Sequence, residues 1–291
     1  MSKKQKSKSR PVSFADAARS ALAASADFEL GAIDPSSTPG YTGDKASGAR
    51  DLVAVGRELG ELQERLFAAS RAGAPQKVLL ILQAMDTAGK GGIVRHVIGA
   101  VDPQGVKLHA FKAPTAAEAK RDFLWRINKQ LPGPGFIGVF DRSHYEDVLI
   151  HKVRGLSPAE EIERRYGAIN DFEAQLADKD TTVIKVMLHI SKDEQRARLA
   201  ERLEREDKHW KFNPADIDER EVWADYMDAY ETAIRRTHMP DAPWFVVPAD
   251  RKWYARLAVA TLLAEALKAI DPQWPAADFD VAEQKRRLAA S

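Results

Sequence analysis

The chain of 291 residues carries 44 Lys and Arg against 43 Asp and Glu, so any polyanion site must come from local clustering rather than from a global field. Cysteine is absent, which excludes disulfides, thiolate catalysis and thiolate metal sites. No apolar run approaches the ~20 residues of a membrane span, and the basic residues 1–10 lack the apolar segment of a secretory signal. We therefore expect a cytoplasmic protein with no membrane contact, whose first ten residues are a solvated tail rather than a nucleic-acid contact.

The first 50 residues show weak structural signals. Residues 11–25 are alanine-rich and predict a weak helix, whereas residues 31–50 hold repeated Pro and Gly and predict an extended loop. From 52 to 66, leucine and valine recur at spacings of three and four, which is typical of an amphipathic helix. We expect residues 1–50 to form a flexible extension and loop, and the main domain to begin at residue 51.

The next feature is a loop between a buried strand and a helix. The apolar run 78–82 leads into Gln83-Ala84-Met85-Asp86-Thr87-Ala88-Gly89-Lys90-Gly91-Gly92. A strand, a Gly-Lys loop and a helix form the layout of a P-loop, in which backbone N–H groups turn toward phosphates and the lysine adds a full charge. We therefore expect a phosphate site that uses Lys90 and the backbone of its neighbours; these are Thr87, Ala88, Gly89, Gly91 and Gly92.

The loop departs from the standard P-loop pattern. Ala84 replaces its first glycine, and Gly91 replaces the Ser or Thr that would hold a metal. Asp86 is a carboxylate inside the loop, which is unfavourable beside phosphates unless a cation lies between them. The alternative for Lys90 is a surface lysine on a tight turn.

Further strands and helices alternate along the chain. We predict strands at 106–111, 136–140, 182–190 and 244–247, and helices at 116–131, about 159–177, from 192, at 217–237 and at 253–270. Together with 78–82, this makes a five-stranded parallel sheet with helices on both faces, a three-layer α/β/α domain over 51–270. Residues 271–291 are expected to be a surface tail.

Asp141 ends the third predicted strand and is followed by Arg142. The carboxyl ends of strands are where open α/β sheets bind ligands, so these residues are candidates for catalysis. Asp86 and Asp141 together suggest a magnesium site, since Mg²⁺ needs few protein oxygens and keeps several waters. The alternative is that Asp141 only caps the next turn.

Two further regions carry charge. In the helix after the fourth strand, Arg198, Arg202 and Arg205 lie on one face, with Lys208 and Lys211 beyond, and we expect a mobile phosphate-covering lid over about 192–215. The alternative is a solvated face balanced by Glu194 and Glu201. Before it, the region holding Lys112, Asp122 and Arg126 is expected to bind an acceptor nucleotide; an ordinary helix ion pair between Asp122 and Arg126 is equally open.

These residues resemble the polyphosphate kinase 2 family of P-loop kinases, which is related in fold to thymidylate kinases. The resemblance covers about 34–270. Among the matching stretches are Met85-Asp86-Thr87-Ala88-Gly89-Lys90-Gly91-Gly92, Phe111-Lys112-Ala113-Pro114-Thr115, Asp122-Phe123-Leu124-Trp125-Arg126, Phe140-Asp141-Arg142-Ser143-His144-Tyr145-Glu146-Asp147-Val148 and Lys208-His209-Trp210-Lys211.

The resemblance implies reversible transfer of the terminal phosphoryl of inorganic polyphosphate to a nucleotide, with Mg²⁺, and hence ATP synthesis. It implies catalytic roles for Asp86, Lys90, Asp141 and Arg142, with Asp86 and Asp141 as metal ligands. It places Arg198, Arg202, Lys208 and Lys211 on the phosphate chain, and Lys112, Asp122, Arg126 and Glu146 at the acceptor nucleotide. It also implies a homo-oligomer.

The choice of acceptor is open at this point. The stretch 142–149 looks most like the subgroup that accepts both AMP and ADP, with guanine nucleotides as a further option. An ATP-dependent nucleoside monophosphate kinase is the alternative enzyme, and a polyphosphate-binding scaffold without catalysis is the alternative of another class.

Overall fold

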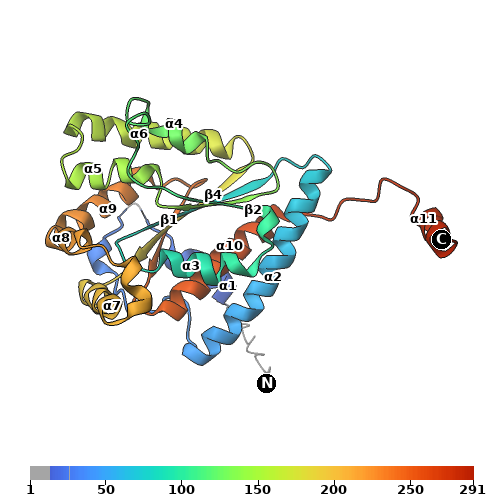
Figure 1. Cartoon of the computed structure of the whole chain (residues 1–291), viewed down its shortest axis with the longest axis horizontal. Helices are drawn as coiled ribbons and strands as arrows, with labels where there is room; N and C mark the ends of the chain where they lie inside the picture. The colour runs from blue at the N-terminus through green and yellow to red at the C-terminus, as the bar shows by residue number, and fades with distance from the viewer. Residues whose placement is uncertain (1–13, 26) are drawn as a thin grey trace, which may run out of the picture.

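A parallel sheet forms the centre of the molecule in the computed structural model, which describes residues 14–25 and 27–291. Its strands are β1 (Lys77–Ala84), β2 (Val106–Ala110), β3 (Ile137–Asp141), β4 (Thr181–His189) and β5 (Trp244–Pro248). They are all parallel and lie in the order β2-β3-β1-β4-β5 (Figure 1). The predicted five-stranded parallel sheet is confirmed.

Strand β1 occupies the middle because it is apolar on both faces. Val78 and the four residues after it are fully buried, as expected for a strand covered by helices on both sides. Leu82 pairs with Asp141 on one side, and Ala84 pairs with Leu188 on the other. Since the strands are parallel, their carboxyl ends meet at one edge, and this edge carries the candidate site.

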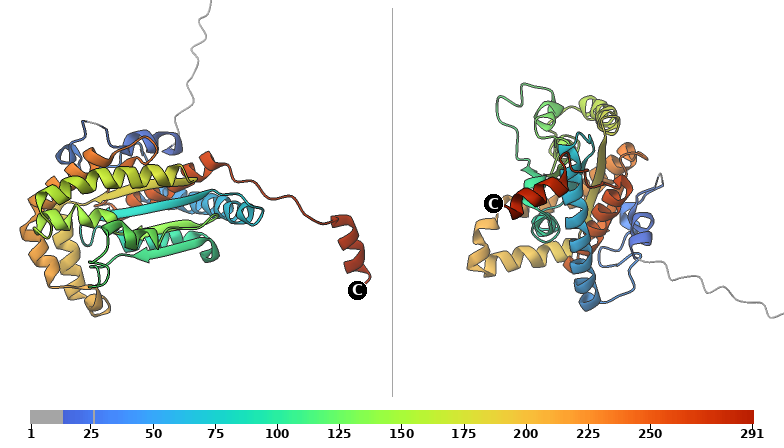
Figure 2. Two further views of the ribbon diagram at one scale, coloured as in Figure 1. Left: turned by 90° about the horizontal axis from the view of Figure 1, so that it is seen from above. Right: turned by 90° about the vertical axis from the view of Figure 1, so that its right-hand side faces the viewer.

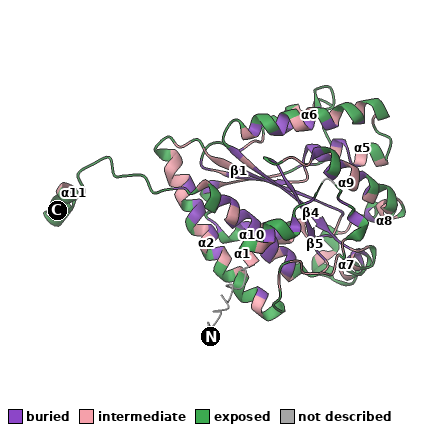
Figure 3. Ribbon diagram, turned by 180° about the vertical axis from the view of Figure 1, so that it is seen from behind, coloured by how far each residue is buried: buried purple, intermediate pink, exposed green. Residues whose placement is uncertain are grey.

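Helices cover both faces of the sheet (Figures 1 and 2). On one face lie α1 (Phe14–Leu22), α2 (Lys45–Arg71), α3 (Lys90–His96) and α10 (Lys252–Ile270). On the other lie α4 (Phe123–Asn128), α5 (Ile150–Val153), α6 (Ala159–Ala177) and α9 (Trp223–Thr237). The helices and strands are purple on their sheet-facing sides in Figure 3, and this buried layer is the core.

A lid stands at the carboxyl edge of the sheet. It consists of α7 (Lys192–Glu204), a 3₁₀ helix (Glu206–Lys211) and α8 (Ala215–Glu221). The stretch Ser191-Lys192-Asp193-Glu194 has the sequence pattern of a capping box, and the Ser191 hydroxyl accepts a hydrogen bond from Glu194 N at 3.1 Å at the start of α7. The predicted three-layer fold with a helical lid is confirmed.

Three predicted elements differ from the structure. Helix α2 begins at Lys45, not near residue 52, because the Asp44 carboxylate caps Ser47 N at 2.8 Å. The helix predicted over 116–131 is limited to α4, since residues 116–121 have good helix propensity but almost no apolar face to bury. The helix predicted over 217–237 is divided at Val222 into α8 and α9.

The chain ends differ in their packing. Residues 1–13, which include the predicted basic tail, lie outside the described part. Helix α1 packs Ala18 and Leu22 into the core, whereas α11 (Val281–Ala289) has no buried residue and stands away from the body (Figure 2). Among the described residues, no helix is both long and apolar enough to span a membrane.

The remaining short elements are 3₁₀ helices. They are Leu30–Ala32, Ile98–Ala100, Pro103–Gly105 and His144–Asp147. The last of these follows β3 directly and enters the candidate site.

Candidate active site

The loop between β1 and α3 has a strained backbone. Gly89 has a φ of 124°, which L side chains rarely adopt, and glycine is needed there. Thr87 has a φ of 65°, which is costly for a β-branched residue, and its buried Oγ1 has no hydrogen-bond partner among the described residues. Strain combined with an unsatisfied buried hydroxyl is the pattern expected of a ligand-binding loop.

Lys90 reaches back across the loop. Its Nζ donates to Ala84 O at 2.9 Å, so the ammonium group is held against the turn. Ala84 is the last residue of β1, and its extended backbone explains why alanine is tolerated where P-loops carry glycine.

The loop lines a cavity of about 620 Å³. Every residue predicted to bind phosphate or to act in catalysis lines this cavity; they are Asp86, Thr87, Ala88, Gly89, Lys90, Gly91, Gly92, Asp141, Arg142, Arg198, Arg202, Lys208 and Lys211. The carboxyl edge of the sheet and the lid thus bring together residues that are more than 120 positions apart in the chain. We call this space the phosphate cavity.

Additional basic residues that line the phosphate cavity were not predicted. They are Arg95, His96, Lys252 and Arg256. Burial lowers the pKa of Arg256, and the neighbouring Arg198 and Arg95 lower it further. Burial, Arg256 and Arg95 likewise lower the pKa of His96. The lowered pKa of His96 favours its neutral form, whereas the charged groups of Arg95, Lys252 and Arg256 would be stabilised by an anion in the cavity.

Arg142 is the charged centre of the site. It has a φ of 62°, and its Nη2 donates to Asp86 Oδ1 at 2.8 Å. Burial alone would lower the pKa of Arg142, but neighbouring carboxylates outweigh it and raise the pKa above its usual range; they are Glu146, Asp86 and Asp141. Arg142 therefore stays cationic at any physiological pH.

Arg198 lines the phosphate cavity, and its guanidinium is bound by the protein itself. It is buried, and its Nη1 donates to Thr87 O and Ala88 O at 3.0 and 2.9 Å. Its other N–H groups bind acceptors outside the loop: Glu194 Oε1, Ala249 O and Asp250 O. All five donors of the guanidinium are thus engaged by protein, so Arg198 supports the loop, and its contact with a phosphate stays a prediction.

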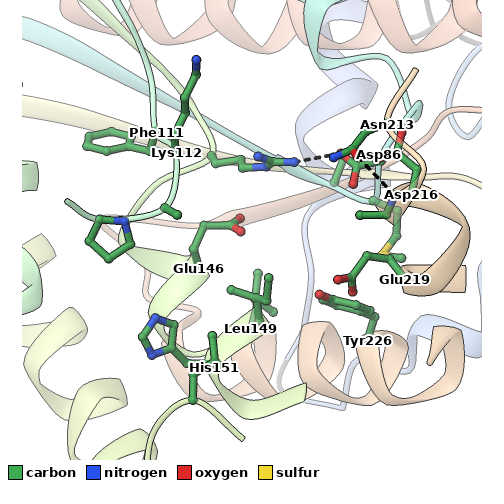
Figure 4. A pocket seen from close by; sticks show the side chains of 18 of the residues that line it. Asp86, Phe111, Lys112, Glu146, Leu149, His151, Asn213, Asp216, Glu219 and Tyr226 are labelled. Atoms are coloured by element: carbon green, nitrogen blue, oxygen red, sulfur yellow. Dashed lines mark hydrogen bonds and ion pairs between the residues drawn. The ribbon is translucent and has the colours of Figure 1, made fainter. Parts of the chain in front are cut away.

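A second cavity of about 300 Å³ lies beside the phosphate cavity (Figure 4). Both are lined by Asp86, Phe111, Lys112 and Arg142, so they share one wall. In Figure 4, Glu146 projects from one side of the second cavity, and Glu219 and Tyr226 face it from the other side. Burial raises the pKa of Glu146, although Arg142 and Lys90 counteract this.

The residues predicted to bind the acceptor nucleotide lie in two different places in the structure. Lys112, Arg126 and Glu146 line the second cavity, but Asp122 does not. Asp122 lines an adjoining groove of about 330 Å³, where it caps Leu124 N at 2.9 Å and lies 3.8 Å from Arg164. The alternative ion pair between Asp122 and Arg126 does not form. Arg126 instead donates to Lys112 O at 2.7 Å and pairs with Asp147.

The residues on the far wall of the second cavity were not predicted from the sequence. Asp216 comes from the lid, pairs with Arg202 at 3.3 Å, and has a pKa raised by burial and by the nearby Asp86. Glu219 and Tyr226 follow on α8 and α9. Asp216 follows Asn213-Pro214, a pair of residues typical of turns, and this is the local sequence signal that the chain changes direction here.

The carboxylate oxygens of Asp86 and Asp141 are suitable ligands for a magnesium ion. Asp86 and Asp141 both line the phosphate cavity, and hydrogen bonds from the described residues reach only one carboxylate oxygen of Asp86. No cluster of three or more His, Asp or Glu side chains suited to a metal occurs in the part of the chain that the structure describes. A magnesium ion here would complete its shell with phosphate oxygens and water, as it commonly does.

Comparison with known proteins bears on the whole chain. Residues 42–275 match the family model for polyphosphate kinase 2. The chain is 45% identical over 248 residues to the AMP/ADP-polyphosphate phosphotransferase of Meiothermus ruber, covering 85% of this chain and 91% of that protein. It is 43% identical to the ADP-polyphosphate phosphotransferase of Rhodopseudomonas palustris, covering 75% of this chain and 78% of that protein.

A crystal structure of polyphosphate kinase 2 from Arthrobacter aurescens superposes with a TM-score of 0.94 at 57% identity, covering 96% of this chain and 99% of that chain. These likenesses extend over the sheet, the loop after β1, and the lid. The chain therefore belongs to the polyphosphate kinase 2 family, a family of phosphate-transferring enzymes.

Proposed function

We propose that this protein moves the terminal phosphoryl of inorganic polyphosphate to ADP and to AMP, and that it catalyses the reverse transfer to make polyphosphate. The observation that carries the proposal is the wall shared by the two cavities. A phosphate chain in one and a nucleotide in the other would meet at Asp86 and Arg142.

The phosphate cavity suits the donor. It is long enough to be lined by α3, α7 and α10 together, and its extra cations continue the site beyond Lys90. A polyphosphate chain carries a negative charge on every unit, so a row of cations outside the loop would be needed to neutralise it. A nucleoside triphosphate would need only the cations close to the loop.

The second cavity suits the acceptor. Lys112 and Arg126 provide charge for the nucleotide's phosphates, and Tyr226 provides an apolar and hydrogen-bonding surface for the remainder. We propose that both AMP and ADP enter, which agrees with the name of the Meiothermus relative, an AMP/ADP-polyphosphate phosphotransferase.

The chemistry asked of the protein is positioning and charge neutralisation. Lys90 and Arg142 would bind oxygens of the transferred phosphoryl as negative charge shifts toward the donor chain. The lid would exclude water, which otherwise competes as the acceptor. An acceptor phosphate oxygen is already anionic at neutral pH, so no strong general base is needed.

We propose Mg²⁺ as the cofactor, held by Asp86 and Asp141 together with phosphate oxygens. When bound, the ion would polarise and neutralise the phosphates that meet at the shared wall. The protein's own part is to present the two carboxylates and to keep Arg142 fixed beside them.

The test is direct. The protein is incubated with polyphosphate, Mg²⁺ and AMP or ADP, and the product nucleotides are separated. We expect ADP from AMP and ATP from ADP, and a parallel incubation with GDP reports base preference. If no new nucleotide forms with either adenine acceptor, the proposal is refuted; transfer from ATP but not from polyphosphate would identify a nucleoside monophosphate kinase instead.

We further propose that the enzyme is cytoplasmic and assembles with copies of itself, as the family resemblance implies. Light scattering during size-exclusion chromatography tests the assembly, and a monomer at micromolar concentration would contradict it.

A further inference from the structure

An ion pair lies inside the protein core, beneath the candidate site. Lys185 of β4 and Glu173 of α6 are both fully buried, and Lys185 Nζ donates to Glu173 Oε2 at 2.6 Å. Lys185 Nζ also donates to Thr237 O at 2.6 Å and to the Tyr145 hydroxyl at 3.1 Å. Burial alone would raise the pKa of Glu173, but Lys185 and His144 outweigh this and lower it, so the carboxylate is ionised.

Stability does not explain such a pair. Removing two charges from water is costly, and replacing a buried ion pair with apolar side chains of similar volume is often neutral or stabilising. The core around the pair is rich in aliphatic and aromatic residues that could fill the space. The contacts that Lys185 and Glu173 make with other residues offer a reason for their charges.

The pair binds the segment that follows β3. Glu173 Oε1 lies 3.2 Å from His144 Nε2 and accepts from the Tyr145 hydroxyl at 2.8 Å. These two residues begin the 3₁₀ helix His144–Asp147, and both side chains are fully buried. One side of this short helix is thus held by the buried pair.

The other side of the same helix faces the acceptor. Glu146 lines the second cavity, and Asp147 pairs with Arg126 in its wall. Arg142, one residue before the N-cap Ser143, has the strained φ of 62°. A single 3₁₀ turn has poor intrinsic stability, and a strained residue persists only where its surroundings determine its position.

We propose that Lys185 and Glu173 are positioning residues for the acceptor site: from within the core they hold His144 and Tyr145, and so set the placement of Glu146 and Arg142. This inference rests on the proposed function, because it takes the second cavity to be the nucleotide site. Neither residue touches that cavity, since Lys185 and Glu173 are absent from its lining.

The first test removes both charges while nearly keeping the volume, in the double variant Lys185→Met with Glu173→Leu. We expect the Tm to fall by a few degrees, because the buried Thr237 O and His144 Nε2 lose their partners, while the KM for ADP rises about tenfold because the acceptor is misplaced. The KM for polyphosphate should rise much less than the KM for ADP, since Arg142 is only one of several cations that line the phosphate cavity.

A milder variant keeps the inference testable if the double variant fails to fold. Tyr145→Phe removes one hydroxyl and leaves the ion pair intact; we expect the KM for ADP to rise about fivefold, the equivalent of one hydrogen bond. The control is Glu163→Gln with Arg236→Gln, which removes an exposed ion pair formed by the same helix α6 and should change neither KM.

Direct ADP binding, measured by calorimetry without polyphosphate, separates this inference from the proposed function. A wild type that binds ADP but transfers nothing from polyphosphate would refute the function, and weaker ADP binding by the variants would still support the positioning role. Unchanged ADP affinity in Tyr145→Phe and in a folded double variant would overturn it. So would an equal rise in both KM values, which indicates general loosening.

Discussion

Replacement of Asp86 by Asn tests the shared wall most sharply. The two side chains have the same shape, so the change removes a charge and leaves the volume of the loop unaltered. Asp86 accepts from Arg142 at 2.8 Å, with the two side chains 31% and 37% exposed, respectively. A pair with that exposure contributes about 1 kcal/mol or less to the free energy of unfolding.

The expected effects on folding and on turnover are therefore very different. The Tm should fall by no more than about 4 °C, the shift that 1 kcal/mol produces in a domain of this size class. The kcat should fall by about 10² to 10³, because a charge that organises the meeting phosphates is lost from a partly buried site. Asp141→Asn should act in the same direction.

The assay follows ATP formation from ADP, polyphosphate and Mg²⁺, with thermal unfolding measured on the same preparations. Asp278→Asn, an exposed change in the C-terminal segment, serves as the matched control and should behave as wild type. Near-wild-type kcat in both Asp86→Asn and Asp141→Asn would refute the two-carboxylate site. A large loss of Tm in Asp86→Asn would mean that the carboxylate has a structural role instead.

Arg198→Ala should lower the Tm by at least about 5 °C, because it leaves several buried carbonyls without donors. Lys208→Ala should leave the Tm unchanged and raise the KM for polyphosphate by about threefold to tenfold. Equal Tm values for the two variants would contradict the supporting role of Arg198. The carboxylate of Glu161, bonded to Arg164 and Arg165, has its pKa lowered to about 2, so its stabilising contribution is complete above its ordinary pKa of 4.5 and is lost as the pH falls toward 2. In urea unfolding, the gap between wild type and Glu161→Gln should therefore close between pH 5 and about pH 2; a gap independent of pH would contradict the ion-pair explanation.

Much of the architecture was predictable because its signals are local. The apolar run of β1, the small residues and lysine after it, and the capping box at Ser191 each occupy a few consecutive positions. The carboxyl ends of parallel strands must meet at one edge, so the presence of Asp86 and Asp141 in one cavity also follows from the predicted parallel sheet.

The errors arose where local propensity conflicted with packing. Residues 116–121 have a helix-forming composition, yet they form turns and a bend, because their only apolar side chains are three exposed alanines that bury little surface. Arg198 and Arg202 look equivalent in a pattern of repeated arginines, although the first is buried with every donor engaged and the second pairs with Asp216 at the cavity.

Sequence alone determined the fold class, the family and the position of the Gly-Lys loop, because each depends on short patterns of residue type and spacing. Only the tertiary structure decided what lies opposite that loop. Arg256 comes from the last core helix, Asp216 from the lid, and the buried Lys185 from the middle of a strand. Their roles depend on distances between segments far apart in the chain, and no local pattern encodes these distances.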